Sequence, residues 1–343
     1  MSQALQIIRL LGLARAARVK RRFDEALPCV RGYAVCSCLW ALLDAGALDR
    51  LLAPGGAAVD DLAADLDRNV LESILTYLDG LSLVRMEGGR VAALPKLERL
   101  MAEPRGFFEL TYAYEPIFAD LGNLLVGKHA YPRDVERRGK YVARGSGQLC
   151  RALPYVVLAD LIRRHGARKV LDLGCGDLAF ISYLREGAPG LRAVGVDIDE
   201  PTVAYARQVL ASTKEADRIE VRCTDMFDLA GVARDHADVD AITAVDTFHE
   251  YLADGEEKIV GLMKQLRAWF PGALLYVGEF CKQPHARLRR SPTAFLEHHL
   301  YHDLTNQTIT TADRWRAMFA AAGLAILEEK VFDIVGHGYF VLR

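Results

Sequence analysis

The chain has 343 residues, enough for two domains that each bury a core. Hydrophobic residues make up 51% and charged residues 26% of the chain, which argues against intrinsic disorder. The net charge of −2 argues against a general nucleic-acid binder, which is normally much more basic.

The seven cysteines form no CxxC pair and follow no regular spacing. This pattern predicts reduced thiols in a cytoplasmic protein and not a disulfide scaffold or a zinc finger. No apolar run approaches the ~20 residues that cross a bilayer, so we expect no membrane association. The basic, amphipathic start "MSQALQIIRLLGLARAARVKRR" is read as a helix that docks on a partner.

Residues 1–100 predict helices followed by a hairpin. The run "LVRMEGGRVAAL" has a Gly-Gly turn between two short extended segments. Helices followed by such a wing are typical of a winged-helix domain, which suggests DNA binding. The expected recognition helix, residues 69–81, carries Glu72 and Asp79 and no Lys or Arg. We therefore expect a dimerisation domain and no nucleic-acid partner.

Residues 101–165 predict a helical linker, rich in tyrosine, that covers the substrate. From residue 166 the pattern changes to five short apolar strands, "KVLDLGC", "RAVGVDI", "RIEVRCTD", "DAITAVD" and "ALLYVGEF". Helical stretches separate them, which is typical of a doubly wound, mostly parallel sheet in an α/β fold. The closing segment "LAILEEKVFDIVGHGYFVLR" leaves no room for a helix and predicts an antiparallel C-terminal hairpin.

A nucleoside cofactor site is predicted where the first of these strands ends. "VLDLGCGDLAF" has Gly174 and Gly176 in a turn between a strand and a helix, where backbone N–H groups can meet a ligand. Asp172 precedes the first glycine, where dinucleotide-binding folds usually have an apolar residue. Other candidates for cofactor binding follow the later strands: Asp197 and Ile198, Asp225 and Met226, and Asp246.

In these residues and in the terminal hairpin, the region from about residue 150 resembles the class I methyltransferases that use S-adenosylmethionine. The region ahead of it resembles the dimerising front half of small-molecule O-methyltransferases. The resemblance implies a Rossmann-like catalytic domain at 166–343 and a homodimer. A nicotinamide-dependent dehydrogenase is the alternative for the glycine motif alone.

Histidines are predicted to gather at the same edge of the sheet. His249 follows the fourth strand, Glu279 ends the fifth, and "LEHHLYHDLTNQ" contributes His298, His299 and His302. Two histidines and a carboxylate form a facial ligand set that suits Fe or Zn and leaves positions open for substrate. The alternative is a general-base histidine without a metal.

The segments "YEPIFADLGNLLVGKHAYPRDVERRGKYVARGSGQ", "DTFHEYL" and "YHDLTNQ" resemble the bacterial α-keto acid C-methyltransferases of the 2-ketoarginine type. The resemblance implies methylation of carbon 3 of an α-keto acid, with 5-guanidino-2-oxopentanoate as the best guess. It also implies His249 and His302 as metal ligands. Glu279 as the third ligand is inferred from its position.

A cation bound to the keto oxygen and carboxylate would lower the pKa of the proton on carbon 3 by stabilising the enolate. Candidates for the base that takes this proton are Asp246, Glu250 and His299. A guanidinium side chain favours carboxylates and aromatic faces. The substrate candidates are therefore Tyr112, Tyr114 and Glu115, with Arg144 for the substrate carboxylate.

Two other functions remain open. One is a metal-free O-methyltransferase of phenolic natural products, with His299 or His302 as the base. The other is a non-enzymatic DNA-binding regulator that senses the cofactor, which the acidic helix at 69–81 argues against.

Overall fold

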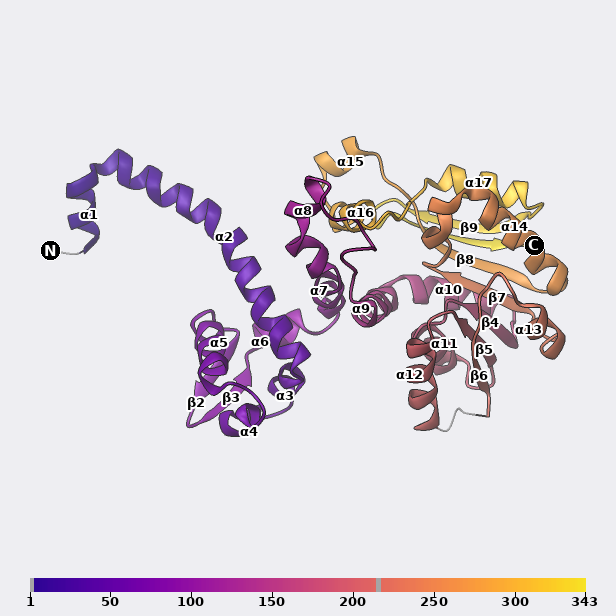
Figure 1. Ribbon diagram of the computed structural model, residues 1–343, viewed down its shortest axis with the longest axis horizontal. Coiled ribbons are helices and arrows are strands. Elements are labelled where there is room, and N and C mark those ends of the chain that lie inside the picture. Colours follow the sequence, from indigo (N-terminus) through magenta and orange to yellow (C-terminus); the bar gives the residue numbers. More distant parts are fainter. Residues whose placement is uncertain (1–2, 214–216) are drawn as a thin grey trace. The chain divides into compact units, whose positions relative to one another are not determined.

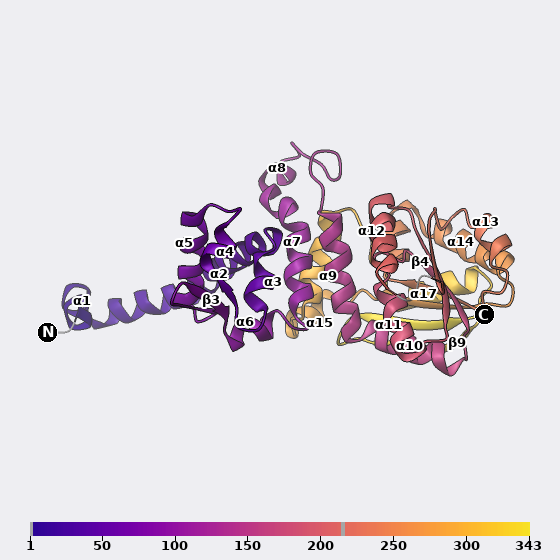
Figure 2. The same ribbon diagram turned by 90° about the horizontal axis from the view of Figure 1, so that it is seen from below.

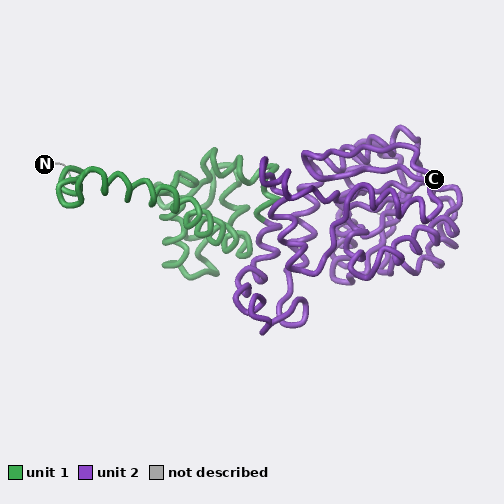
Figure 3. The backbone as a smooth tube through the Cα atoms, turned by 90° about the horizontal axis from the view of Figure 1, so that it is seen from above, with its two compact units in different colours: residues 1–108 green, residues 109–343 purple. Residues whose placement is uncertain are grey.

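The computed structural model describes residues 3–213 and 217–343, and the chain divides into two compact units, 1–108 and 109–343 (Figure 3). The helices after residue 108, which the sequence suggested as a separate linker, belong to the second unit. They do so because Cys150 and Leu158 share a hydrophobic core with Val170 of the sheet.

The first unit consists of six helices and a small antiparallel sheet in the order β1-β3-β2. Its elements are α1 (Gln3–Leu11), α2 (Leu13–Asp44), α3 (Ala47–Leu52), β1 (Ala57–Ala58), α4 (Val59–Ala63), α5 (Arg68–Gly80), β2 (Val84–Glu87), β3 (Arg90–Ala93) and α6 (Pro95–Leu100). Strands β2 and β3 form the expected hairpin, with Gly88 and Gly89 in the left-handed conformation at its turn.

The predicted N-terminal helix is interrupted at Gly12, and its second half continues into the following apolar helix as α2, one element of 32 residues with Pro28 inside it. Only its last turns, from Leu39 to Leu43, are buried, and its first half extends beyond the rest of the unit (Figures 1 and 2). By length and composition α2 could cross a membrane, contrary to the expectation from the shorter apolar runs. That criterion alone is weak evidence, because core helices of soluble proteins also meet it.

The second unit is built on a seven-stranded sheet with helices on both faces (Figure 1). The strands are β4 (Lys169–Leu173), β5 (Arg192–Asp197), β6 (Ile219–Cys223), β7 (Ala241–Val245), β8 (Leu274–Phe280), β9 (Ile326–Phe332) and β10 (His337–Leu342). The helices are α7 (Arg105–Ala119), α8 (Leu121–Leu125), α9 (Gly139–Ala152), α10 (Pro154–Arg164), α11 (Ala179–Gly187), α12 (Glu200–Ala211), α13 (Ala230–Asp235), the 3-10 helix η1 (Phe248–Asp254), α14 (Glu256–Trp269), α15 (His285–Arg290), α16 (Phe295–Leu304) and α17 (Ala312–Ala321).

The sheet has the order β6-β5-β4-β7-β8-β10-β9. Strands β4 to β8 are parallel, and β10 pairs antiparallel with both β8 and β9. The predicted α/β fold with a C-terminal hairpin is therefore confirmed. From β4 the chain builds outward through β5 and β6, then returns to place β7 on the other side of β4. This topological switch point is where α/β sheets bind their ligands.

Alternation along each strand divides the core between the two faces of the sheet. In β4, Leu171 and Leu173 pack with residues of α14 and α17, whereas Val170 packs with residues of α10 and α11. Because both faces are covered, the central strands read as nearly continuous apolar runs.

Candidate active site

The glycine turn after β4 is shaped by two positions that only glycine satisfies well. Gly174 has φ +69°, and a Cβ there would lie 2.8 Å from Cγ2 of Thr247. Gly176 has φ +53°, and its N–H donates to Oδ2 of Asp197 at 3.0 Å. The turn therefore brings the end of β4 against the loop after β7 and leads directly into α11.

Asp172 lies in β4 just before this turn. Its carboxylate is buried and accepts a hydrogen bond from the hydroxyl of Thr243 at 2.6 Å. Burial raises the pKa of Asp172 to about 7, although the Thr243 hydrogen bond lowers it and the nearby Asp197 raises it further. Asp172 is thus poised between its two protonation states near neutral pH.

Four predicted residues lie at or just after the ends of the neighbouring strands, at the same edge. Asp197 ends β5 and accepts the N–H of Gly176 and of Asp199, whereas Asp225 follows β6 and accepts the N–H of Phe227. Met226 is buried, and Ile198 is 59% exposed. An exposed apolar side chain between two fixed carboxylates is well suited to a nucleoside.

Tyr251, which the sequence analysis did not single out, belongs to this region. Its ring packs edge-on against Phe227, and the ammonium of Lys258 lies 4.8 Å from its centroid. Burial, followed by the charges of Asp225, Glu250 and Asp197, raises the pKa of Tyr251 to about 12. Tyr251 therefore experiences the charges of carboxylates that lie at or after the ends of three different strands, β5, β6 and β7.

The predicted convergence of distant histidines is present. His249 in η1 and His302 in α16 are both buried, and their Nε2 atoms are 3.3 Å apart. The other nitrogen of His249, Nδ1, donates to Glu279 at 2.9 Å, and Nδ1 of His302 donates to the carbonyl of His298 at 2.8 Å. Each ring is thus held through Nδ1, and the two Nε2 atoms face each other.

The two imidazoles have opposite pKa shifts. Burial lowers the pKa of His249, but the charges of Glu279, Glu250 and Asp246 outweigh burial and raise it to about 9. Burial and the neighbouring His249 lower the pKa of His302 to about 3. Without a ligand, His249 is therefore cationic and donates its Nε2–H to the neutral Nε2 of His302.

Glu279 supports His249 and does not face His302. One of its oxygens accepts the backbone N–H of Thr247 at 2.9 Å and of Phe248 at 2.6 Å. The other accepts Nδ1–H of His249. The inference that Glu279 is a direct metal ligand does not fit this geometry. One of its oxygens accepts backbone N–H groups, and the other accepts the Nδ1–H of His249, on the opposite side of the ring from Nε2.

The remaining histidines of α16 differ from His302. His298 is stacked against Phe280, with centroids 3.9 Å apart, and burial lowers its pKa well below the ordinary value. His299 packs edge-on against Phe295. The choice among the three that the sequence left open therefore favours His302.

A partly buried arginine that sequence reasoning missed joins this centre. Arg137 donates to both oxygens of Glu250, at 3.1 Å and 3.3 Å, and to the hydroxyl of Tyr114 at 3.2 Å. Oε1 of Glu250 lies 3.9 Å from Nε2 of His249. Burial favours the neutral form of Glu250, but Arg137 and His249 hold its pKa below the ordinary value. The spacing of residues in the sequence does not identify Arg137 as a site residue, because its partners come from the distant elements α7 and η1.

The predicted substrate residues fall into three groups. Tyr114 is stacked on Tyr301 of α16, with centroids 4.6 Å apart, and contacts the centre through Arg137. Glu115 is paired with Arg138, which also lies over the ring of Tyr112. Arg144 is paired with the buried Glu109. Only Tyr114 is linked by these contacts to the histidine pair.

Asp246 follows β7 with φ +51°, a strained conformation for a residue other than glycine. Its carboxylate contacts His337 and Cys150, neither of which was predicted. The strain lies directly at the switch point between β4 and β7.

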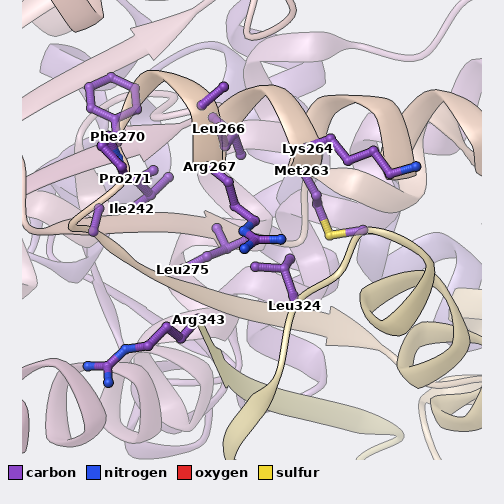
Figure 4. Close-up of a pocket in the computed structure, with 12 residues that line it drawn as sticks. Ile242, Met263, Lys264, Leu266, Arg267, Phe270, Pro271, Leu275, Leu324 and Arg343 are labelled. Atoms are coloured by element: carbon purple, nitrogen blue, oxygen red, sulfur yellow. The ribbon is translucent and has the colours of Figure 1, made fainter.

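A separate surface hollow of about 390 Å³ lies near the amino ends of β7 and β8, lined among others by Ile242, Leu275 and Arg343 (Figure 4). None of the predicted site residues lines it. It lies at the edge of the sheet opposite the glycine turn and has no part in the site.

Comparison with known proteins identifies similar methyltransferases. Residues 171–270 match the model of a methyltransferase domain. A 2-ketoarginine methyltransferase from Streptomyces arginensis is 28% identical over 323 residues, which cover 91% of each chain. The structure of human N-acetylserotonin methyltransferase in complex with SAM has a TM-score of 0.69 at 15% identity, covering 94% of this chain and 97% of that chain. An O-methyltransferase family protein from Burkholderia thailandensis has a TM-score of 0.63 at 16% identity, covering 93% and 97%.

The two solved structures share the fold, and the matched domain spans the glycine turn and the strand-end carboxylates. Together with these features of the site, the comparisons identify the chain as a class I S-adenosylmethionine-dependent methyltransferase.

Proposed function

We propose that the enzyme methylates carbon 3 of an α-keto acid, with 5-guanidino-2-oxopentanoate as the first substrate to test. The observation that carries this proposal is the pair of buried imidazoles whose Nε2 atoms face each other at 3.3 Å. The similarity to a 2-ketoarginine methyltransferase along nearly the whole chain supports the choice of substrate class.

The separation of the Nε2 atoms is compatible with a shared divalent cation. Two nitrogens bound to one Zn²⁺ at roughly 2.1 Å with a tetrahedral angle are about 3.4 Å apart. The hydrogen bond from Nδ1 of His249 to Glu279 is the usual support of a metal-bound histidine. Over residues 3–213 and 217–343, no group of three or more His, Cys, Asp or Glu side chains is arranged around one such point. Two protein ligands would leave the other positions to substrate and water.

We assign His249 and His302 as the residues that would hold Fe or Zn. Such a cation would supply positive charge that acidifies the proton on carbon 3 of a bound keto acid. Glu279 fixes the ring of His249, and the carbonyl of His298 fixes the tautomer of His302. Glu250 is the base candidate that contacts the pair, with Oε1 3.9 Å from Nε2 of His249.

Arg137 is the residue we expect to bind the substrate carboxylate. Its guanidinium is largely buried, points at Glu250 and lies beside the histidine pair. Arginine binds carboxylates with two parallel hydrogen bonds, which fixes orientation as well as charge. In this proposal the carboxylate of the keto acid accepts one or both of the Arg137 hydrogen bonds that Glu250 now accepts.

The side-chain end of the substrate is less closely defined. A guanidinium group needs a carboxylate, yet Arg138 pairs with Glu115 and Arg144 pairs with Glu109. A guanidino substrate would therefore displace a resident arginine. For this reason the substrates to be tested include a 2-keto acid with an aromatic side chain.

A metal-free O-methyltransferase is the second candidate. The observation that favours it is the neutral Nε2 of His302, whose lone pair is already directed by the bond from Nδ1 to His298. Such a nitrogen can accept the proton of a phenol directly. The O-methyltransferase among the structural neighbours supports this reading at the level of the fold.

We further propose a cytoplasmic homodimer. Phe23, Leu27 and Val30 are exposed at i, i+4 and i+7 on α2, so they form one apolar face. Apolar side chains in this number along one helix suit a second copy of the chain better than water. The only basic residue of α5, Arg68, pairs with Asp60 and Glu72, which supports the absence of a nucleic-acid partner.

The substrate is tested by incubating the enzyme and S-adenosylmethionine with 5-guanidino-2-oxopentanoate, an aromatic 2-keto acid and a set of phenols. The proposal predicts a 3-methyl-2-keto acid, and it predicts that a chelator abolishes its formation until Fe²⁺ or Zn²⁺ is restored. Methylation of phenols alone, indifferent to the chelator, would establish the second candidate instead.

A further inference from the structure

Asp246 is held by side chains from two elements that are distant in sequence. Oδ1 accepts Nε2–H of His337, the first residue of β10, at 2.6 Å, and Oδ2 accepts the thiol of Cys150 in α9 at 3.2 Å. The backbone N–H of Asp246 donates to the carbonyl of Gly278 in β8 at 2.8 Å. The carboxylate therefore has one orientation, fixed from both sides.

This arrangement is costly, so a structural role alone explains it poorly. The side chains of Asp246 and His337 are 10% and 4% exposed, and taking a carboxylate out of water costs several kcal/mol. The left-handed conformation of Asp246 adds strain. The other ring nitrogen of His337, Nδ1, meets no hydrogen-bonding group in the part of the chain that the structure describes. Among the described residues, the side chain of His337 therefore hydrogen-bonds to Asp246 alone.

The position of Asp246 indicates which part of the cofactor it faces. Asp197 and Asp225, the carboxylates suited to the ribose and adenine, follow β5 and β6 on one side of the glycine turn. The methionine end of the cofactor must then extend the other way along the sheet order, over β4 towards β7. Asp246 follows β7, and its neighbour Thr247 touches Gly174.

The methionine end carries an ammonium group, and a locked anion is a suitable partner for it. We propose that Asp246 binds the α-ammonium group of S-adenosylmethionine and that His337 and Cys150 are positioning residues that aim its carboxylate. Burial opposes ionisation of Asp246, but His337, His249 and Cys150 hold its pKa below the ordinary value. A carboxylate that stays ionised is a suitable partner for an ammonium group.

The role assigned to His337 concerns the cofactor alone and holds whether the acceptor is a keto acid or a phenol. Calorimetric titration therefore uses two ligands without any acceptor. S-adenosylhomocysteine has the ammonium group, and 5′-methylthioadenosine has the same nucleoside and thioether but no amino-acid end.

For Asp246→Asn and His337→Phe, we expect S-adenosylhomocysteine to bind at least about tenfold more weakly, with 5′-methylthioadenosine changed less than about twofold. The double variant should bind S-adenosylhomocysteine no more weakly than Asp246→Asn does, because the two substitutions disrupt the same interaction with the ammonium group. His337→Gln, whose amide nitrogen reaches the place of Nε2, should restore most of the loss, whereas the shorter His337→Asn should not.

His337→Phe leaves a buried anion without its partner and can fail to fold. In that case Asp246→Asn, the double variant and His337→Gln still decide. The first two carry no charge at position 246, and the third keeps a donor within reach of Asp246. Equal losses for both ligands, or unchanged binding of both in Asp246→Asn, would overturn the assignment.

Discussion

In the proposed mechanism the chemistry depends most on His302, because its neutral Nε2, which now accepts Nε2–H of His249, would take up a cation or a proton. The bond from Nδ1 to the carbonyl of His298 fixes that tautomer. Its neighbour His299 is turned towards Phe295 and takes no part in the pair. A sequence with two histidines at i and i+4 and a third beside them cannot by itself distinguish these roles.

We expect His302→Ala to lower kcat about 100-fold or more, because removal of a ligand or base at the reacting centre has this effect. His299→Ala is the matched control, since it removes an imidazole of the same helix, and should stay within about threefold. Steady-state kinetics with the best substrate measure both. A greater loss in His299→Ala than in His302→Ala would reverse the assignment.

Asp172 gives a pH-dependent prediction. Its pKa of about 7 in the folded chain lies above its ordinary value, so the unfolded chain releases this proton at lower pH than the folded chain. The group therefore reduces stability as pH rises from about 4 to 7, and the reduction is complete above pH 7. Asp172→Asn, which keeps an acceptor for Thr243, should be more stable than the wild type at pH 8.5 and no more stable at pH 4. Urea unfolding at the two values, without cofactor, tests this; an equal difference at both would contradict it.

The element that could be predicted best is the turn between β4 and α11, since its strand, its glycines and the strand-end carboxylates lie close together in sequence. Strands β4 to β8 could be predicted equally well, because a strand that is buried on both faces appears in the sequence as a continuous apolar run. Arg137, Tyr251 and His337 were missed because each acts through partners from other elements. The sequence predicted Glu279 in the correct region. Its role depends on which ring nitrogen of His249 it contacts, and the sequence does not show this.

Gly174→Ala tests the turn as an element. Its φ of +69° and the approach of Thr247 to 2.8 Å both oppose a side chain, so we expect a loss of about 1–2 kcal/mol or more in unfolding free energy and weaker cofactor binding. Adding Thr247→Ser removes the Cγ2 atom in contact and should recover part of the loss. Gly190→Ala, where no atom lies within 4 Å, is the control. Thermal unfolding and calorimetry provide the measurements, and equal effects at the two glycines would contradict the packing argument.

At the scale of the whole molecule, one unit carries the sheet and the site, and the other leaves an apolar helix face open. If a second copy covers that face, Phe23→Glu should convert the dimer to a monomer, since a buried carboxylate without a partner is strongly disfavoured. Ala17→Glu adds the same charge at another exposed position of α2 and should leave the dimer intact. Light scattering after size exclusion gives the mass; a wild-type monomer, or a dimer in both variants, would contradict the proposal.

The central claim is that distant imidazoles, His249 and His302, together make an α-keto acid reactive at carbon 3. It is tested most directly by incubating the enzyme with a 2-keto acid in deuterated water without S-adenosylmethionine and following carbon 3 by NMR. We predict deuterium uptake that the wild type catalyses and that His302→Ala loses. No uptake above the uncatalysed rate with any 2-keto acid, or equal uptake in His302→Ala, would contradict the claim.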